Sequence, residues 1–289
     1  MDDRSVAEAA ARAEWIERAA HCDLMTCGGS PVLQRRLGLS VAHCGPSLVL
    51  RSRGIDSLLF NRSFGLEDSM PDAVPLADSV VARFRAQAIP RYFVHLPAAT
   101  QSDALRRHLH ALGLSRYPRS WHVLVRERES LATGPLSQRV ERASRRDAAA
   151  VAALMVSGFD MPEAAGSLIA AAVGAPRWHT YVVRDTAGEA TAALLMHVDA
   201  ELAHITLMST VSTYRRRGAQ RELLERAVSV ALDLGCQQIS AETGEPVSGE
   251  ANPAHELLER TSFRVVRVRE NWAPHGTRWH AAPSARAAL

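Results

Sequence analysis

The sequence predicts an α/β protein made of two similar domains in tandem. Hydrophobic residues make up 47% of the 289 residues, which is enough for a core in each half. Segments with helical and strand patterns alternate, and the order strand, loop, helix, strand, helix, strand occurs twice, over 56–126 and 203–270. A tryptophan follows the last helix of each copy, at Trp121 and Trp272. An internal repeat explains this pattern, and a chance agreement between two common α/β orders is the alternative.

The first domain is predicted to cover 1–130. Alanine, glutamate and arginine favour a helix from Val6 to Ala20, and Gly28-Gly29-Ser30-Pro31 interrupts the helical pattern. Runs rich in leucine and valine predict strands, and Gly113 closes the last helix as a C-cap glycine would. After the first helix we expect strands at 47–52 and 56–61, a helix at 76–88, a strand at 91–96, a helix at 102–112 and a strand at 120–126.

The second domain is predicted to cover 140–272. The charged stretch before it contains Gly134-Pro135, so we expect a linker at 131–139. The final stretch, 273–289, is rich in alanine, proline and arginine and is expected to be a flexible tail. Between them we expect helices at 144–157 and 163–173, strands at 179–185, 190–198 and 203–211, a helix at 219–234, a strand at 237–242, a helix at 253–261 and a strand at 263–270.

The composition argues against several classes of function. The net charge is +3, and the cations are all arginines that alternate with acidic residues, whereas nucleic-acid binding needs basic residues gathered on one face. No apolar run reaches the roughly 18 residues of a membrane span, and the N-terminus is acidic where a secretory signal is basic. The four cysteines lack the spacing of a zinc site. We therefore expect a cytoplasmic protein without a metal, nucleic-acid or membrane partner, and a homodimer is left open.

A turn in the second domain has the character of a phosphate-binding site. A predicted strand ends near Val211, and a predicted helix begins at Gly218-Ala219. The first turn of a helix leaves backbone N–H groups unpaired and carries the positive end of the helix dipole, so it holds a phosphate well. Gly218 permits a close approach of the backbone, and the arginines at 215–217 can neutralise negative charge. The alternative is a surface turn whose arginines are solvated.

The same stretch resembles the acyl-CoA signature of the GNAT superfamily of N-acyltransferases, Arg/Gln-x-x-Gly-x-Gly/Ala. Arg215 matches the first position and Gly218 the fourth, whereas Gln220 replaces a small residue. The resemblance, with its order of helices and strands, extends over 140–272 and implies two GNAT-like domains, each a mixed, mostly antiparallel central sheet flanked by helices. It also implies acetyl-CoA as the acyl donor. The residues that it implies for binding the donor are Met208, Ser209, Thr210, Val211, Arg215, Arg216, Arg217, Gly218, Ala219 and Gln220.

The last predicted helix resembles a second GNAT pattern, Asn-x-x-Ala-x-x-Leu-Tyr-x-x-x-Gly-Phe. Ala254, Leu257 and Phe263 match it. Leu258 stands where the superfamily carries a tyrosine that is credited with protonating the departing thiolate. The usual general acid is therefore missing.

Three residues are candidates for proton transfer. His204 lies eleven residues before the first signature position, where some superfamily members place a glutamate base, and the alternative is a histidine packed on a half-buried strand. Glu242 ends the following strand and is a base acting through water, a group that holds a cationic substrate, or a solvated carboxylate. His255, in the first turn of the last helix, is the candidate to replace the missing acid.

The first domain lacks such a phosphate turn. At the equivalent place it carries Gly65–Asp72, which contains three acidic residues that would repel a pyrophosphate and a proline that removes an N–H donor. We predict a degenerate first domain and one CoA site per chain. The expected function is transfer of an acetyl group from acetyl-CoA to a primary amine, on a small molecule rather than on a protein. The alternative is a non-catalytic CoA-binding or interaction module.

Overall fold

The computed structural model describes residues 3–26, 30–67, 69–98, 103–128 and 139–279. Most of the expected linker at 131–139 and the end of the expected tail lie outside these residues. The beginning of that tail is ordered, since strand β12 extends to Pro274 and the backbone N–H of Trp279 donates to the Tyr117 hydroxyl at 3.0 Å. No helix in the described ranges is both long enough and apolar enough to cross a membrane.

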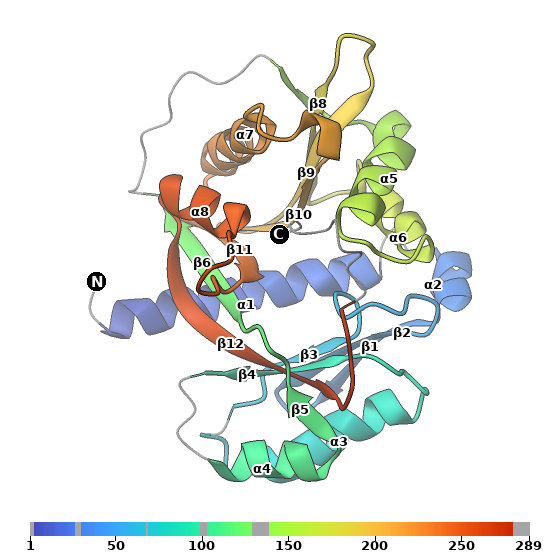
Figure 1. Ribbon diagram of the computed structural model, residues 1–289, viewed down its shortest axis with the longest axis vertical. Helices are drawn as coiled ribbons and strands as arrows, with labels where there is room; N and C mark the ends of the chain where they lie inside the picture. The colour runs from blue at the N-terminus through green and yellow to red at the C-terminus, as the bar shows by residue number, and fades with distance from the viewer. Residues whose placement is uncertain (1–2, 27–29, 68, 99–102, 129–138, 280–289) are drawn as a thin grey trace.

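The twelve strands form one sheet that runs through both halves of the chain (Figure 1). Eleven strands follow the order β1-β2-β3-β4-β12-β6-β11-β10-β9-β8-β7, and β5 pairs with β12 beside this path. The strands are β1 Leu39–Cys44, β2 Ser47–Ser52, β3 Arg62–Phe64, β4 Phe93–Pro97, β5 Leu114–Arg116, β6 Trp121–Glu127, β7 Val140–Arg142, β8 Trp178–Arg184, β9 Ala190–Asp199, β10 Leu202–Thr210, β11 Gln238–Gly244 and β12 Arg264–Pro274.

The two halves exchange their last strands. Strand β6 ends the first half and pairs with β11 of the second half, while β12 ends the second half and pairs with β4 of the first. These two exchanged strands also pair with each other in the middle of the sheet. The result is a single sheet in which the last strand of each half pairs with strands of the other half.

Helices cover both faces of this sheet. Helix α1 (Asp3–Met25) crosses the middle of one face, where it contacts β6, β9, β10, β11 and β12 (Figure 1). Alanines at positions 9, 10, 13 and 20 allow it to lie close to the strands, and Ile16 and Leu24 fill the core. The same face carries α5 (Ala148–Gly158) and α6 (Ala164–Ala172), and the opposite face carries α7 (Ala219–Asp233) and α8 (Pro253–Arg260). Helices α3 (Ala73–Arg85) and α4 (Asp103–Ala111) cover the first half, and α2 (Pro31–Leu37) packs against β1 and α6.

Two pairs of parallel strands diverge part-way along their length. Strands β10 and β11 pair only from Leu202 to Ile205, after which β10 continues along β9 and β11 continues along β6. A β-bulge between Ile205 and Leu207 bends β10 at this point. In the first half, β3 and β4 pair in parallel over two residues only, at the corresponding place in the repeat. Each half therefore contains one opening between diverging parallel strands.

One predicted strand is wrong, and four helices or strands of the described residues were not predicted. Residues 56–61 form turns rather than a strand, because the Asn61 side chain closes a loop. Its amide donates to the Ile55 carbonyl at 2.9 Å and accepts from the Ser52 N–H at 2.7 Å. The strand lies just beyond, in β3, and the sequence analysis did not predict α2, β1, β5 or β7.

Candidate active site

The turn between β10 and α7 presents unpaired backbone donors. A 3-10 turn (Ser212–Tyr214) follows β10, and Gly218 caps α7 in the left-handed conformation, with φ 82°. The first backbone bond of the helix runs from the Glu222 N–H to the Gly218 carbonyl. Within the described ranges, the amides of residues 216–220 donate to no backbone carbonyl. This arrangement suits an anion, because five N–H groups and the positive end of a 15-residue helix meet there.

Side-chain contacts fix the shape of this turn. The Tyr214 hydroxyl donates to Asp185 at 2.8 Å, and the Arg217 guanidinium lies 4.9 Å from the centre of the Tyr214 ring. Arg215 is half-buried and donates from Nε to the Thr210 carbonyl at 3.3 Å, whereas Arg216 and Arg217 are exposed. Gln220, which replaces the expected small residue, is half-buried beside Ala219. The exposed arginines are the ones available to meet a negatively charged ligand.

The end of β10 leads from the turn into the opening between the strands. Met208, Ser209 and Thr210 pair with β9 on one side only, since β11 has already diverged. Val211 donates to the Thr191 carbonyl and ends the strand. The last residue of α5, Gly158, lies so close to β10 that an added Cβ would meet Ser209 Oγ at 1.9 Å. One backbone edge of residues 208–210 therefore faces the opening.

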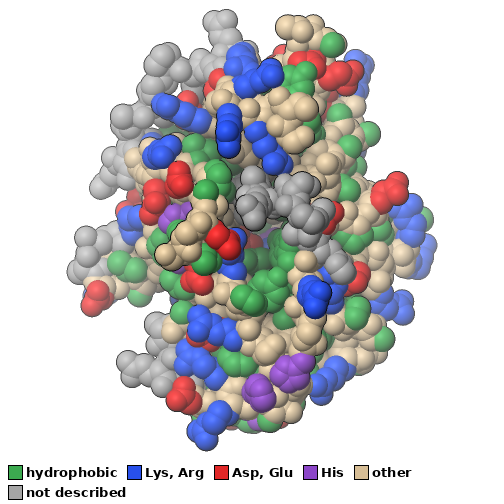
Figure 2. Space-filling view, viewed as in Figure 1, with side chains coloured by type: hydrophobic (Ala, Val, Ile, Leu, Met, Phe, Trp, Pro, Cys, Tyr) green, Lys and Arg blue, Asp and Glu red, His purple; other side chains and the backbone are tan. Residues whose placement is uncertain are grey.

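A pocket occupies the opening between β10 and β11. The space inside it that water molecules can occupy is about 30 Å³, and the pocket is open to solvent and visible as a hollow with an apolar floor in the centre of Figure 2. Most of its wall is apolar, and its charged groups are Arg62 and Glu242. The lining residues come from α1, the loop before β3, β3 itself, the start of β6, the end of α5 and the strands β10 and β11: His21, Leu24, Leu59, Phe60, Arg62, Trp121, Phe159, Thr206, Leu207, Glu242, Thr243 and Gly244.

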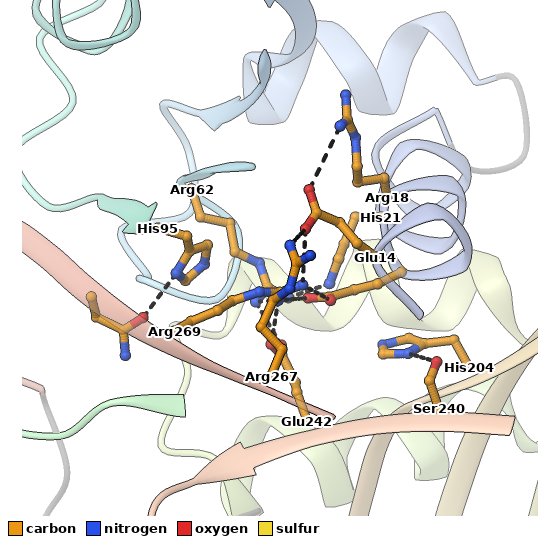
Figure 3. A network of polar contacts seen from close by, with 12 residues as sticks. Glu14, Arg18, His21, Arg62, His95, His204, Ser240, Glu242, Arg267 and Arg269 are labelled. Carbon is orange, nitrogen blue, oxygen red and sulfur yellow. Dashed lines mark hydrogen bonds and ion pairs between the residues drawn. The ribbon is translucent and has the colours of Figure 1, made fainter. Parts of the chain in front are cut away.

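Glu242 lines this pocket and lies next to two arginines (Figure 3). Arg62 donates to Glu242 Oε1 at 2.6 Å, and Arg269 donates to Oε2 at 3.4 Å. Burial raises the pKa of Glu242 to about 7, although Arg62 and Arg269 oppose this increase. A carboxylate with such a pKa changes its protonation state near neutral pH, which is the property of a general base.

Helix α1 adds Glu17 and His21 to the same polar cluster. Glu17 forms an ion pair with Arg269 at 2.6 Å, and His21 contacts the Arg62 guanidinium. Burial alone would raise the pKa of Glu17, but Arg269 and Arg62 hold it well below its usual value. Glu17, His21 and Glu242 place one potential metal ligand each within 4.8 Å of the others. Two guanidinium groups already lie among these ligands, so electrostatic repulsion disfavours a metal cation at this place.

His204 and His255 lie outside the pocket wall. The His204 side chain points toward α1, is 1% exposed, and bonds to the Ser240 hydroxyl at 3.0 Å. Burial lowers the pKa of His204 to about 4, which makes it a weaker base than an ordinary histidine. His255 lies on α8 at the other face of the sheet, where it contacts His122 at 2.9 Å. Of the three catalytic candidates, only Glu242 lines the pocket.

The sequence analysis did not identify the partners of Glu242. Arg62 is 180 residues away from it, and Glu17 and Arg269 come from the two ends of the chain. The spacing of Glu17 and His21, four residues apart on a helix, and the alternating arginines of β12 at 267 and 269 were signals of buried charge on one face. No signal in the sequence indicated that these faces meet.

Ion pairs fill the corresponding opening of the first half. Arg267 contacts Glu14 at 2.5 Å and Glu67 at 3.4 Å, beside Phe64 and His95 at the point where β3 and β4 diverge. Glu67 belongs to the acidic segment 65–72, of which Asp68 lies outside the described residues. The absence of a CoA site in the first half stays a prediction, and the pairing of Glu67 with Arg267 gives this acidic loop a structural role.

Comparison with known proteins identifies the fold. No protein-family model and no curated protein matches the sequence. Solved structures do match it. A GCN5-related N-acetyltransferase from Kribbella flavida aligns with a TM-score of 0.58 at 16% identity over 85% of this chain and 92% of its own. One from Sphaerobacter thermophilus aligns with a TM-score of 0.57 at 12% identity over 80% and 81%.

A two-domain protein is similar over nearly the whole chain. A tandem GNAT protein from the clavulanic acid biosynthesis pathway aligns with a TM-score of 0.54 at 11% identity, over 94% of this chain and 95% of its own. At these identities the similarity concerns the fold, and it confirms the predicted α/β class with GNAT-like units around a mixed, mostly antiparallel sheet. The chain therefore has the GNAT fold in its tandem form.

Proposed function

We propose that this chain is an N-acyltransferase that moves an acetyl group from acetyl-CoA to a primary amine on a small molecule. The observation that carries the proposal is the opening between β10 and β11, which links a turn of unpaired amides to a pocket containing Glu242. Acyl-CoA has a diphosphate at one end and a thioester at the other. An anion site and a reaction pocket joined by an open backbone edge can bind both ends of such a molecule.

The two ends of the proposed donor site fit this chemistry. The amides of residues 216–220, with Arg216 and Arg217, would bind the pyrophosphate. The open edge of residues 208–211 would hydrogen-bond the pantetheine arm, as a neighbouring strand would. When bound, the donor supplies an activated acyl group at the mouth of the pocket. Gln220 is half-buried and leaves the phosphate site narrower than a small residue would.

Glu242 is the proposed general base. A primary amine has an ordinary pKa of about 10, so it must lose a proton before its nitrogen can attack a thioester. The Glu242 carboxylate would accept that proton, directly or through one water molecule. Its raised pKa makes it a stronger base than an exposed glutamate. The apolar walls at Leu59, Phe60, Trp121 and Phe159 favour an amine carried on an apolar body.

A second candidate function is a CoA-binding module without catalysis. Leu258 favours it, because this residue takes the place of the tyrosine that protonates the thiolate in the superfamily and lies 1% exposed in an apolar core. In that case the chain would bind CoA esters but release no thiol.

The test is Glu242→Gln, with thiol release from acetyl-CoA measured against a panel of primary amines. Removal of a general base should lower kcat/KM by about 10²- to 10⁴-fold while the Kd for CoA stays unchanged. Glu245→Gln is a matched control, because this carboxylate bonds to the Ser120 N–H outside the pocket wall. Binding of CoA without thiol release from any amine would refute the enzyme and favour the module.

A further inference from the structure

The closest cation to Glu242 comes from the other half of the chain. Arg62 belongs to β3, and three strands, β4, β12 and β6, separate β3 from β11 in the sheet. At about 4.8 Å per strand, a flat sheet would hold β3 and β11 about 19 Å apart. Arg62 Nη1 nevertheless lies 2.6 Å from Glu242 Oε1. Two side chains extended toward each other cover only part of that separation, so the sheet is curved, and its concave face, beneath α1, brings the two halves together at the pocket (Figures 1 and 3).

The Arg62 guanidinium is held in one position. Its side chain is 2% exposed, and its carbon Cζ lies 5.1 Å from the centre of the Phe64 ring and 5.3 Å from that of Trp121. Nη2 contacts His21, and Nη1 lies 3.8 Å from Glu17 as well as bonding to Glu242. Rings and hydrogen-bonding partners on several sides leave this group little freedom, so it can fix the carboxylate that it binds.

The charges around Glu242 depend on its own protonation. The titratable and charged groups that face this cluster come from α1 (Glu14, Glu17, Arg18 and His21), β3 (Arg62), the loop after β3 (Glu67), β4 (His95), β10 (His204) and β12 (Arg267 and Arg269). Burial lowers the pKa of each of the three histidines well below neutrality, so these side chains are uncharged at pH 7.

The remaining charges nearly cancel. Arg18 and Arg267 pair with Glu14 and Glu67, and Arg269 pairs with Glu17. Arg62 is then balanced only when Glu242 is ionised. A protonated Glu242 would leave a buried, uncompensated guanidinium, which is costly.

We propose that Arg62 is a positioning residue that keeps Glu242 oriented and ionised, so that the first half of the chain supplies part of the reaction site. The inference rests on the proposed function of Glu242 as a base. It assigns a role in the reaction to a half that has no predicted CoA site. Glu17 has the opposite effect. Its negative charge lies close to Glu242 and disfavours the ionised form of Glu242.

The experiment compares two substitutions that both break buried ion pairs but should move Glu242 in opposite directions. The ionisation of Glu242 is followed by ¹³C NMR of the glutamate carboxyl groups, assigned by difference from Glu242→Gln, with no ligand present. Loss of the positive charge in Arg62→Met should raise the Glu242 titration midpoint by about one to three pH units, and Glu17→Gln should lower it. In the pH profile of kcat/KM for acyl transfer, the decrease toward acid should move with these midpoints. At pH 7 the acyl-transfer rate of Arg62→Met should fall about fivefold or more.

Two controls separate this role from a purely structural one. Arg51→Met removes a buried arginine of the neighbouring strand β2 that points away from the pocket and donates to the Arg83 carbonyl, so it should leave the midpoint in place. Arg62→Lys keeps the charge and should restore most of the midpoint, and it serves if Arg62→Met does not fold. A midpoint that Arg62→Met leaves unmoved, or that both substitutions shift in the same direction, overturns the proposal. The titration needs no turnover, so a chain without acyl transfer refutes the proposed function and still tests this inference.

Discussion

The substitution Gly218→Glu tests the phosphate turn, and its cost in folding stability follows from the backbone conformation at this position. Gly218 is in the left-handed region at φ 82° and ψ −4°, and an added Cβ would have Glu222 Oε1 at 3.6 Å as its nearest neighbour. Space is therefore available, and the cost to folding comes from the backbone conformation. For a residue with a side chain this cost is about 1–2 kcal/mol of the free energy of unfolding.

The effect on binding should be larger than the effect on folding. The new carboxylate would lie beside the unpaired amides of residues 216–220, where a pyrophosphate is expected. Two unit charges 4 Å apart repel by about 1 kcal/mol in water and about 4 kcal/mol at an effective dielectric constant of 20. The Kd for CoA should therefore rise by roughly 5-fold to 1,000-fold.

Gly235→Glu is the matched control. Gly235 lies beyond the other end of α7 at φ 87°, with no atom within 4 Å of an added Cβ, so the charge and the backbone strain are the same. Calorimetric titration with CoA should show weakened binding for Gly218→Glu alone, while urea unfolding should show a loss of stability for both, larger by up to about 1 kcal/mol for Gly235→Glu, whose charge lies at the negative end of the α7 dipole. Equal affinities in the two variants, or no binding of CoA to the unmodified chain, would refute the anion site.

Two further predictions concern stability. Because burial lowers the pKa of His204 from its usual 6.5 to about 4, this group contributes stability above pH 6.5 that is lost as pH falls through 4. The contribution is up to about 3 kcal/mol, so urea midpoints of His204→Gln should fall less steeply with acid than those of the unmodified chain, and an identical slope would contradict the assignment. Gly158→Ala should lower the thermal midpoint despite the better helix propensity of alanine, because its Cβ would meet Ser209 Oγ at 1.9 Å. Adding Ser209→Gly should restore the thermal midpoint. A thermal midpoint of Gly158→Ala above that of the unmodified chain would contradict the predicted clash with Ser209.

Local signals predicted most elements of the fold. In the second half, helix α7 was expected at 219–234 and lies at Ala219–Asp233, because its apolar periodicity and its flanking glycines are all local. In the first half, Ser30-Pro31 was interpreted as an interruption, whereas Ser30 caps α2 and Pro31 begins it. The loop before β3 was predicted as a strand because its leucines indicate burial. No pattern in the sequence indicated that the Asn61 side chain would bond to the backbone of Ser52 and Ile55 and close this loop.

The site also has a part that local sequence predicts and a part that depends on contacts between distant residues. The phosphate turn is contiguous in sequence, so its residues could be identified together. The choice between His204 and Glu242 as residues that face the pocket could not be made from the sequence. It depends on α1, which lies over the His204 side of β10 and leaves Glu242 at the edge of the pocket. The arginine that binds Glu242 lies 180 residues away, beyond the reach of any pattern in one sequence.

The exchange of strands explains how a half without a phosphate turn contributes to the opening used by the other. Strand β11 pairs with β6 along its whole length, from Gln238 to Gly244, whereas β10 follows β9 as far as Thr210. Each diverging strand is thus held on its outer side by a different neighbour, and one of those neighbours belongs to the first half. The opening between β10 and β11 is stable because backbone hydrogen bonds from both halves hold its two sides. The same exchange joins β3 and β11 in one sheet, and the curvature of that sheet lets Arg62 reach Glu242.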